Sequence, residues 1–384
     1  MAAEQLFPGA ADELGRWYIV RFPEDMPAGE MAGLLAERSD VTRIQYDKLL
    51  HSEPFGVTMH EPSAGIATKD NAAVFDDPML PEQWHMVNDG SRTHCTSAVE
   101  GADVAVKDAW KLTGGDPSII VAVLDYGVMY THPDLAPNMW VNEAELNGQE
   151  GVDDDGNGYV DDIYGYNFAS NGPVTWDKDG DHAHGTHVAG TVAAVNNNGV
   201  GVCGVAGGTG SGDGIRMMTC QIFSKTSSSA GMARAFKYAA DNGASVAQCS
   251  FGYDAEVFAY EEEYRSKCAV EYAAIQYFLD KSHNTYCQVL STVPEANGEP
   301  GYGWLEGTSM STPHVSGVAA LGLSYARKLG KKFSREEFVS MLLTSVNDID
   351  RYFVGTKPLA ATGTMNLADY VGKMGTGAVD ACAG

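Results

Sequence analysis

The sequence predicts an α/β fold built on a mostly parallel sheet with helices on both sides. Residues 118–125 form a β-branched apolar run, which is typical of a strand buried on both faces. Residues 214–223 and 244–252 are further strand candidates, and residues 230–242 between them are a helix candidate. Strands that alternate with helices favour parallel pairing. At 384 residues, the chain is long enough to bury a large core of this kind.

Apolar periodicity and capping residues predict further helices. Apolar side chains recur every three or four positions from Val257 to Leu279, which predicts one long amphipathic helix. Ser334 is followed three residues later by Glu337, so residues 334–343 are expected to form a capped helix. Residues 105–110 are expected to form a shorter helix that leads to the strand at 118–125.

Composition narrows the possible partners. The 51 acidic and 25 basic residues give a formal charge of −26, which argues against nucleic acid as a partner. The seven cysteines are spread out without a CxxC pair, so buried thiols are favoured over a disulfide framework. No stretch reaches the ~18 apolar residues of a membrane span, and no signal peptide is visible. We expect a monomer without a membrane span.

Ser309 is the first of three residues suited to acyl transfer. It lies in Gly307–Gly317 (GTSMSTPHVSG), a glycine-bounded turn that leads into an apolar helix ending near Lys328. Pro313 is expected in the first helical turn, where a proline is tolerated. A helix N-terminus offers free N–H groups, which favour an alkoxide and a nearby oxyanion. Ser309 is therefore a candidate nucleophile.

Two upstream residues can activate this serine. Asp125 stands at the carboxyl end of the strand at 118–125, where open α/β sheets carry their chemistry. His184 lies in Asp181–Thr191 (DHAHGTHVAGT), ahead of a predicted helix at 186–195. A serine nucleophile needs a histidine base and a carboxylate that orients the histidine.

The motifs GTSMSTPHVSG and HGTHVAG, with the chain order Asp125, His184, Ser309, resemble those of the subtilisin-like serine proteases, the subtilase family. The resemblance implies a subtilisin-like three-layer fold and a serine endopeptidase that cleaves a peptide or protein substrate through an acyl-enzyme. It also implies a secreted or cell-envelope location. By resemblance, one wall of the primary specificity pocket is formed by Ser250, Phe251 and Gly252.

The chain departs from the family pattern at two places. Tyr126 replaces the serine or threonine that usually stands beside the carboxylate. No Ala-Gly-Asn turn occurs between Ser250 and Ser309, so a sheet segment near 281–287 and its oxyanion asparagine are missing. The Ser309 backbone N–H remains as one oxyanion donor, and Asn284 is the nearest substitute for the other. These departures favour an alternative function, a weakly active or inactive protease-like protein that binds peptides.

The N-terminal segment is expected to form a separate unit. Strands at 16–22 and 41–50 around a helix at 28–37 make residues 1–51 resemble a shortened inhibitory propeptide. The alternative is an N-terminal extension with its own small sheet. Residues 52–75 are interpreted as a linker, and residues 76–384 as the catalytic domain.

An acidic loop at Gly151–Asp162 begins like a calcium-binding loop. Oxygen donors recur at alternate positions, a glycine occupies the sixth position, and Tyr164 replaces the usual glutamate at the twelfth. The alternative is a solvated acidic loop. We expect a structural Ca²⁺ whose ligands are Asp153, Asp155, Asn157, Tyr159 and Asp161.

Histidines near His184 allow a third function. His182, His184 and His187 could hold a metal ion in a hydrolase, although spacing places no fourth ligand. His132 precedes a proline and is interpreted as an ordinary loop residue.

Overall fold

The computed structural model describes most of the chain, namely residues 2–47, 58–59, 74–90, 100–176, 183–224, 227–252, 266–278, 289–296, 299–305, 307–348, 350, 354–359, 363–371 and 378–382. Its centre is a five-stranded sheet in the order β6-β5-β7-β4-β8. Neighbouring strands pair in parallel except β6, which is antiparallel to β5. The strands are β4 (Ile120–Asp125), β5 (Gly165–Asn167), β6 (Gly172–Pro173), β7 (Arg216–Gln221) and β8 (Val246–Cys249). The predicted α/β architecture with a mostly parallel sheet is confirmed.

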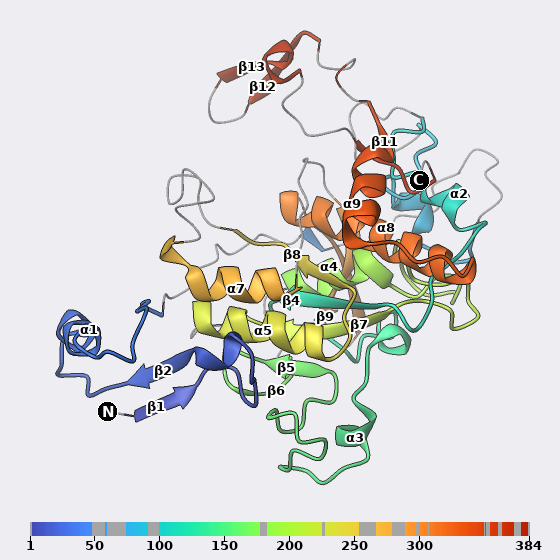
Figure 1. Cartoon of the computed structure of the whole chain (residues 1–384). Helices are drawn as coiled ribbons and strands as arrows, with labels where there is room; N and C mark the ends of the chain where they lie inside the picture. The colour runs from blue at the N-terminus through green and yellow to red at the C-terminus, as the bar shows by residue number, and fades with distance from the viewer. Residues whose placement is uncertain are drawn as a thin grey trace.

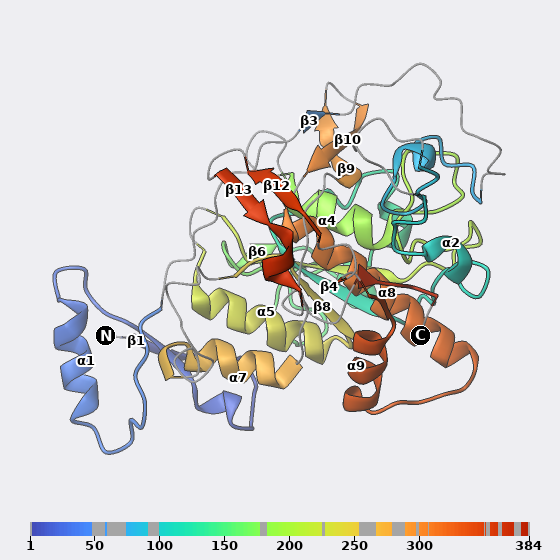
Figure 2. The same ribbon diagram turned by 90° about the horizontal axis from the view of Figure 1, so that it is seen from above.

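Helices cover both faces of this sheet, as Figures 1 and 2 show. One face carries α4 (His184–Ala193) and α8 (Thr308–Lys328), and the other carries α5 (Ser229–Asp241) and α7 (Ala269–Phe278). Because side chains alternate along a strand, β4 contributes to both cores. Val121 and Val123 pack in the core that includes α4 and α8, whereas Ala122 and Leu124 pack in the core that includes α5. An apolar run of this kind is what a doubly covered strand requires.

A second, three-stranded antiparallel sheet contacts α4. Its order is β3 (Thr58–Met59), β10 (Glu299–Leu305) and β9 (Val289–Ala296), and β3 lies within the predicted linker at 52–75. The fit of β9 on α4 is close, because a Cβ at Gly190 would lie 2.1 Å from Thr292 Oγ1. The predicted missing segment at 281–287 and Asn284 lie outside the described residues.

The N-terminal unit differs from its prediction. The expected strand at 16–22 is observed as β2 (Tyr18–Arg21), and the expected helix as α1 (Ala28–Ala36). The expected second strand at 41–50 is wrong for its described part, since residues 41–47 are irregular. The strand that pairs with β2 is β1 (Ala2–Gln5). The side chains of Gln45 and Asp47 instead bind the ends of two helices, as described below.

Shorter elements complete the described chain. The capping box predicted for α9 is confirmed: Ser334 Oγ accepts from Glu337 N at 3.2 Å, and Ser334 N donates to Glu337 Oε2 at 2.8 Å. Of the long helix predicted at 257–279, residues 266–278 are described, and a bend at Cys268 precedes α7, so this part is not one continuous helix. The other elements are η1 (Leu14–Arg16), η2 (Leu80–Glu82), α2 (Val106–Ala109), η3 (Ala136–Asn138), α3 (Glu143–Leu146), α9 (Arg335–Thr344), β11 (Val346–Asn347), β12 (Thr356–Leu359), β13 (Gly363–Asn366), η5 (Leu367–Tyr370) and β14 (Ala378–Val379).

Two expectations from composition can be checked here. The helices of the described chain include none with the length and apolarity needed to cross a membrane. The five cysteines in the described part carry free thiols, and three of them are buried. Buried thiols were the expected state.

Candidate active site

Asp125 and His184 meet at the carboxyl edge of the central sheet. Asp125 ends β4, His184 begins α4, and Asp125 Oδ1 lies 2.7 Å from His184 Nδ1. Both side chains are buried. Burial alone would lower the pKa of His184, but the charge of Asp125 and its hydrogen bond outweigh burial and raise that pKa. With Nδ1 donating to the carboxylate, the neutral ring keeps Nε2 free of a proton, as a general base requires.

Tyr126 changes how this carboxylate is held. Its backbone N–H donates to Asp125 Oδ1 at 2.7 Å. Among the described residues, Asp125 Oδ2 is buried without a hydrogen-bond partner. The side-chain hydroxyl that the family usually places beside the aspartate therefore has no counterpart here.

Ser309 is bound reciprocally to Ser250. Ser309 Oγ donates to the Ser250 carbonyl at 3.1 Å, and Ser250 Oγ donates to the Ser309 carbonyl at 2.8 Å. The prediction that Pro313 lies in the first helical turn is wrong, because α8 begins at Thr308 and Pro313 is its sixth residue. A proline has no N–H for the carbonyl four residues earlier, which is that of Ser309. The Ser250 hydroxyl supplies the missing donor.

The strand register brings Ser309 to the same sheet edge as Asp125. Leu124 of β4 pairs with Cys249 of β8, so the next residues, Asp125 and Ser250, stand side by side where the two strands end. Adjacent strands are about 5 Å apart. The predicted Asp125, His184 and Ser309 are thus brought to one edge, with Ser250 as the link between strand and helix.

An aromatic surface lies beside His184. The Tyr126 ring meets His184 edge-on with centroids 6.4 Å apart, and it lies 5.3 Å from Phe223. Phe223 in turn packs edge-on against Phe251 at 5.3 Å. Phe251 was predicted, whereas Phe223 was missed, although each stands two residues after the end of a parallel strand. Gly252 is exposed, and a Cβ there would meet nothing within 4 Å.

His187 is bound to the second sheet through one of its ring nitrogens. Its Nε2 lies 2.9 Å from the Val289 carbonyl and 3.2 Å from that of Gly303, so it binds the second sheet. Burial lowers its pKa to about 3. His182 lies outside the described residues. Main-chain oxygens thus engage Nε2 of His187, whereas its Nδ1 is buried without a hydrogen-bond partner among the described residues.

Three further histidines are buried. His314 Nε2 lies 2.7 Å from His85 Nδ1, and His314 Nδ1 lies 2.8 Å from the Met310 carbonyl. His132, predicted as an ordinary loop residue, is buried, with Nε2 3.0 Å from the Gly301 carbonyl. The sequence did not reveal that His85 bonds to His314 or that His132 bonds to Gly301, because the members of each pair lie far apart in the chain.

The acidic loop gathers three carboxylates. Single oxygen atoms of Glu145, Asp153 and Asp155 lie within 4.8 Å of one another. Glu145 is buried and orders the loop, because its oxygens accept from Asp154 N at 2.7 Å and Asp161 N at 2.9 Å. The sequence pattern missed Glu145 because it precedes the loop, in α3. Three close carboxylates, one of them buried, fit a hard divalent cation.

The other predicted calcium ligands bind within the loop itself. Asn157 Oδ1 accepts from Tyr159 N at 2.8 Å, and Asp161 accepts from Gly151 N at 3.0 Å. The Tyr159 ring packs in an aromatic cluster with Tyr166, Phe168 and Tyr238. Of the three carboxylates predicted as ligands, the structure gathers Asp153 and Asp155, together with Glu145, and leaves Asp161 outside this group.

Sequence comparisons agree with this geometry. The profile of the subtilase family matches residues 116–281 and 276–366, which together span more than half of the chain. The Major intracellular serine protease of Bacillus subtilis (strain 168) is 31% identical over 309 residues, covering 69% of this chain and 88% of that protein. Subtilisin-like protease 1 of Plasmodium berghei (strain Anka) is 29% identical over 286 residues, 59% of this chain and 45% of the relative. The chain thus spans less than half the length of that relative.

Solved structures share the fold. The serine protease of Aeromonas sobria has a TM-score of 0.52 at 16% identity, covering 83% of this chain and 70% of that one. The same protease in complex with its chaperone ORF2 has a TM-score of 0.55 at 16% identity, covering 80% of this chain and 66% of that one. Family profile, relatives and fold agree, and the chain belongs to the subtilase family.

Proposed function

We propose that the chain is a serine endopeptidase whose triad is Asp125, His184 and Ser309. The observation that carries this proposal is the 2.7 Å hydrogen bond from His184 to Asp125, at the sheet edge to which Ser250 ties Ser309. The raised pKa of His184 favours its role as proton acceptor. Membership of the subtilase family supports the same assignment.

The reaction follows from these positions. Ser309 Oγ turns from the Ser250 carbonyl towards His184 Nε2, which takes its proton as Oγ bonds to the substrate carbonyl carbon. His184 then gives the proton to the leaving amine, and an acyl-enzyme remains for water to hydrolyse. The backbone N–H of Ser309, in the first turn of α8, can donate to the oxyanion. The aromatic surface of Tyr126, Phe223 and Phe251 favours apolar substrate side chains.

A second function, peptide binding with little or no cleavage, is favoured by two observations. Ser309 Oγ gives its hydrogen bond to the Ser250 carbonyl, and the sequence has no Ala-Gly-Asn turn before Ser309. Loss of one oxyanion donor costs about 10²–10³ in turnover, a magnitude measured in subtilisin itself. A folded protein with an intact cleft could then hold a peptide without cutting it.

One experiment separates the candidates. The protein is incubated with a fluorophosphonate probe and, separately, with unfolded casein, and Ser309→Ala is compared with Ser311→Ala on the same helix turn. Labelling and cleavage that vanish in Ser309→Ala and persist in Ser311→Ala support the protease. A well-folded sample that does neither supports the binding protein. Cleavage that ignores the probe and stops on zinc removal supports the metal hydrolase.

We also propose that Glu145, Asp153 and Asp155 hold a structural Ca²⁺, which supplies charge neutralisation to the loop. Terbium luminescence, sensitised by Tyr159 in the same loop, reads binding without any assay of activity. Asp153→Asn should abolish the signal. Asp154→Asn is the matched control, because Asp154 bonds to Gln149 N and lies outside the cluster.

The N-terminal unit is proposed to act as a propeptide that assists folding of the rest of the chain. Asp47 Oδ1 accepts from Ala230 N at 3.0 Å in the first turn of α5. Gln45 Oε1 accepts from Val270 N at 3.0 Å in the first turn of α7, and its amide donates to Glu271. The unit thus caps two adjacent helices. If the proposal holds, Asp47→Ala lowers the refolding yield, whereas Asp25→Ala, which removes an exposed carboxylate of the same unit, does not.

A further inference from the structure

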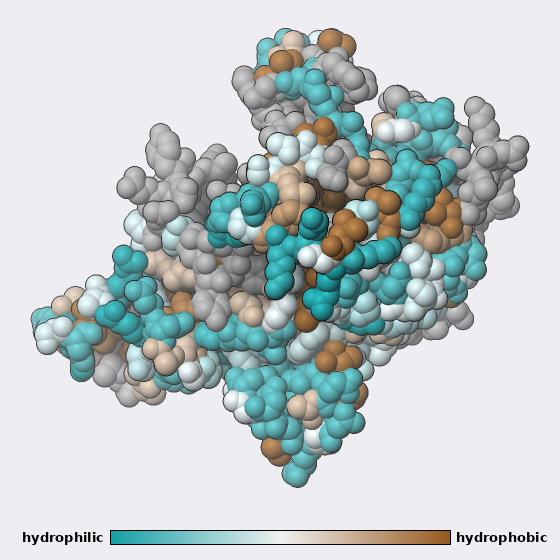
Figure 3. All heavy atoms as spheres, turned by 45° about the vertical axis from the view of Figure 1, so that its right-hand side comes forward, coloured by the Kyte–Doolittle hydropathy of each residue, from teal (hydrophilic) through white to brown (hydrophobic). Residues whose placement is uncertain are grey.

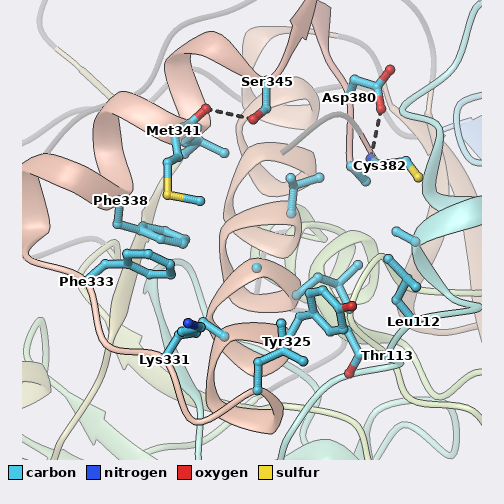
Figure 4. A pocket seen from close by; sticks show the side chains of 18 residues that line it. Leu112, Thr113, Tyr325, Lys331, Phe333, Phe338, Met341, Ser345, Asp380 and Cys382 are labelled. Carbon is cyan, nitrogen blue, oxygen red and sulfur yellow. Dashed lines mark hydrogen bonds between the residues drawn. The ribbon is translucent and has the colours of Figure 1, made fainter.

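A cavity of about 220 Å³ lies at the other end of the nucleophile helix (Figure 4). It is open on one side and is lined by the C-terminal half of α8, by α9, by residues 380–382 and by Ala109, Leu112 and Thr113. The first residue of α8 that lines it is Val318, nine residues after Ser309 and therefore roughly 14 Å along the helix. The lining is mostly apolar, and Figure 4 shows Phe333 and Phe338 side by side at its edge.

The cavity is bordered by an unusual concentration of positive charge. Residues 327–335 (RKLGKKFSR) carry five cations and no acid, in a chain with a net charge of −26. Lys331 lines the cavity and is exposed, as is Lys332. In the part of the chain that the structure describes, neither lysine forms an ion pair. Lys328 is fixed at the same rim, where it donates to the Leu112 carbonyl at 2.7 Å.

The nearby carboxylates are already engaged. Asp380 lines the cavity, but its two oxygens accept from Asn347 Nδ2 at 2.9 Å and Cys382 N at 2.8 Å. Glu337 accepts from Ser334 N at the start of α9, and Asp116 pairs with Arg327 at 3.3 Å. Asp380 and Glu337 keep their negative charge, because their hydrogen-bond donors are neutral. Glu336 pairs with Arg335 at 3.4 Å, so Lys331 and Lys332 remain at the rim as cations that no described carboxylate pairs with. Figure 3, which turns this side of the molecule forward, shows apolar side chains gathered between hydrophilic ones.

We infer that this cavity is a docking site for an acidic peptide segment of a partner protein, anchored by one large apolar side chain. The apolar lining takes the anchor, and Lys331 and Lys332 take the flanking carboxylates. The rest of this acidic chain repels such a segment, so charge complementarity directs it here. The inference does not depend on the proposed catalysis, because Ser309 lies at the opposite end of α8.

Two other occupants fit less well. A membrane surface needs a broad face of outward-pointing apolar side chains. Phe333 is 42% exposed, but Phe338 lines a hollow of about 220 Å³ that accepts a single side chain. A second copy of the chain would bring two basic rims together across a two-fold axis, and like charges oppose that contact. The acidic peptide satisfies both the apolar and the charged part of the site.

The probe is a fluorescein-labelled nine-residue peptide with a central tryptophan flanked by glutamates. Two matched peptides replace either the glutamates by lysines or the tryptophan by glycine. Fluorescence anisotropy is measured with the full chain carrying Ser309→Ala, so that no peptide is cut. We expect the acidic tryptophan peptide to bind at least tenfold more tightly than either matched peptide, with an affinity that falls as salt rises. Equal binding of the three peptides, or no binding, overturns the inference.

Two variants test the basic rim and the apolar cavity separately. Lys331→Glu with Lys332→Glu reverses the charge, and Gly322→Leu fills the cavity, because a Cβ at Gly322 points at the Phe338 ring from 3.3 Å. Each should weaken binding at least tenfold. Arg16→Glu with Arg43→Glu is the matched control, since it makes the same charge change on exposed residues of the N-terminal unit.

Melting curves establish that each variant is folded. If either the charge-reversed or the cavity-filled variant fails to fold, the other one still tests the inference. Binding that ignores both variants contradicts the inference. So does cosedimentation with phosphatidylserine vesicles in the absence of peptide binding, which would assign the basic rim to a membrane surface.

Discussion

The two ends of helix α8 follow different rules of packing. At the N-terminal end, Ser309 and His314 are buried, and their polar atoms bind Ser250, His85 and the helix backbone. At the C-terminal end, residues 327–330 are exposed and the helix borders a cavity. The same helix therefore holds polar side chains in a buried hydrogen-bond network at one end and presents an exposed surface at the other. The difference arises from the partners that each end meets, since the helix itself is continuous.

The largest expected effect is on peptide-bond turnover, and it distinguishes the N-terminal end of α8 from the rest of the helix. Ser309→Ala should lower peptide-bond turnover by at least about 10⁴-fold, because no nucleophile remains. Ser324→Ala removes a buried hydroxyl of the same helix, which donates to the Ala320 carbonyl at 2.7 Å, and should leave turnover within about twofold. Steady-state hydrolysis of a chromogenic peptide measures both. Equal losses in the two variants would remove Ser309 from the mechanism.

The buried histidines of the N-terminal end predict sensitivity to acid. Burial lowers the pKa of His314 to about 4, against about 6.5 in the unfolded chain. Between these values the unfolded chain binds the extra proton, so stability is full above pH 6.5 and falls by about 1.4 kcal/mol per pH unit as pH drops to 4.

Urea unfolding at pH 7.5, 6 and 5 tests the sign. The wild-type stability should fall more steeply than that of His314→Gln, which cannot titrate at this position. Parallel pH profiles for the two proteins would mean that His314 stays neutral in both the folded and the unfolded chain.

Substitutions at two glycines of α8 test how tightly its two halves are packed. A Cβ at Gly317 would lie 2.5 Å from Val205 Cβ, whereas one at Gly322 would lie 3.3 Å from the edge of the Phe338 ring. Gly317→Ala should destabilise the fold by about 1–3 kcal/mol through overpacking. Gly322→Ala should be neutral or stabilise by up to about 1 kcal/mol, because alanine is the better helix former. Denaturant midpoints at constant m-value report the difference, and equal shifts would refute the contrast.

Motif-bearing parts of the molecule could be predicted from the sequence. The continuous β-branched apolar run at 118–125 was enough to identify β4, and the motif around His184 gave the start of α4 to within two residues. Local patterns of this kind determine local structure. The capping box of α9 is a further example, since both of its hydrogen bonds lie within four residues.

Contacts between distant segments were beyond the same reasoning. Glu145 joins the acidic loop from α3, and His85 reaches His314 across 229 positions. Pro313 was assigned to the first turn because proline favours it, but α8 starts earlier since Ser250 supplies the donor that the proline removes. Each of these depends on which element comes to lie beside another, and no local pattern carries that information.

The smallest expected effect tests the link between Ser250 and Pro313. Ser250→Ala leaves the buried Ser309 carbonyl without its donor and should cost about 1–2 kcal/mol, part of it from Gln248 Nε2, which donates to Ser250 Oγ. Pro313→Ala restores a backbone N–H four residues after Ser309, which can replace the lost donor. The double variant should therefore be less destabilised than the sum of the single changes, by about 1 kcal/mol. Both proteins that carry Ser250→Ala lose the Gln248 hydrogen bond, so this loss cancels in the double-mutant cycle. If the changes in unfolding free energy of the two single variants add within about 0.5 kcal/mol, Ser250 and Pro313 act independently.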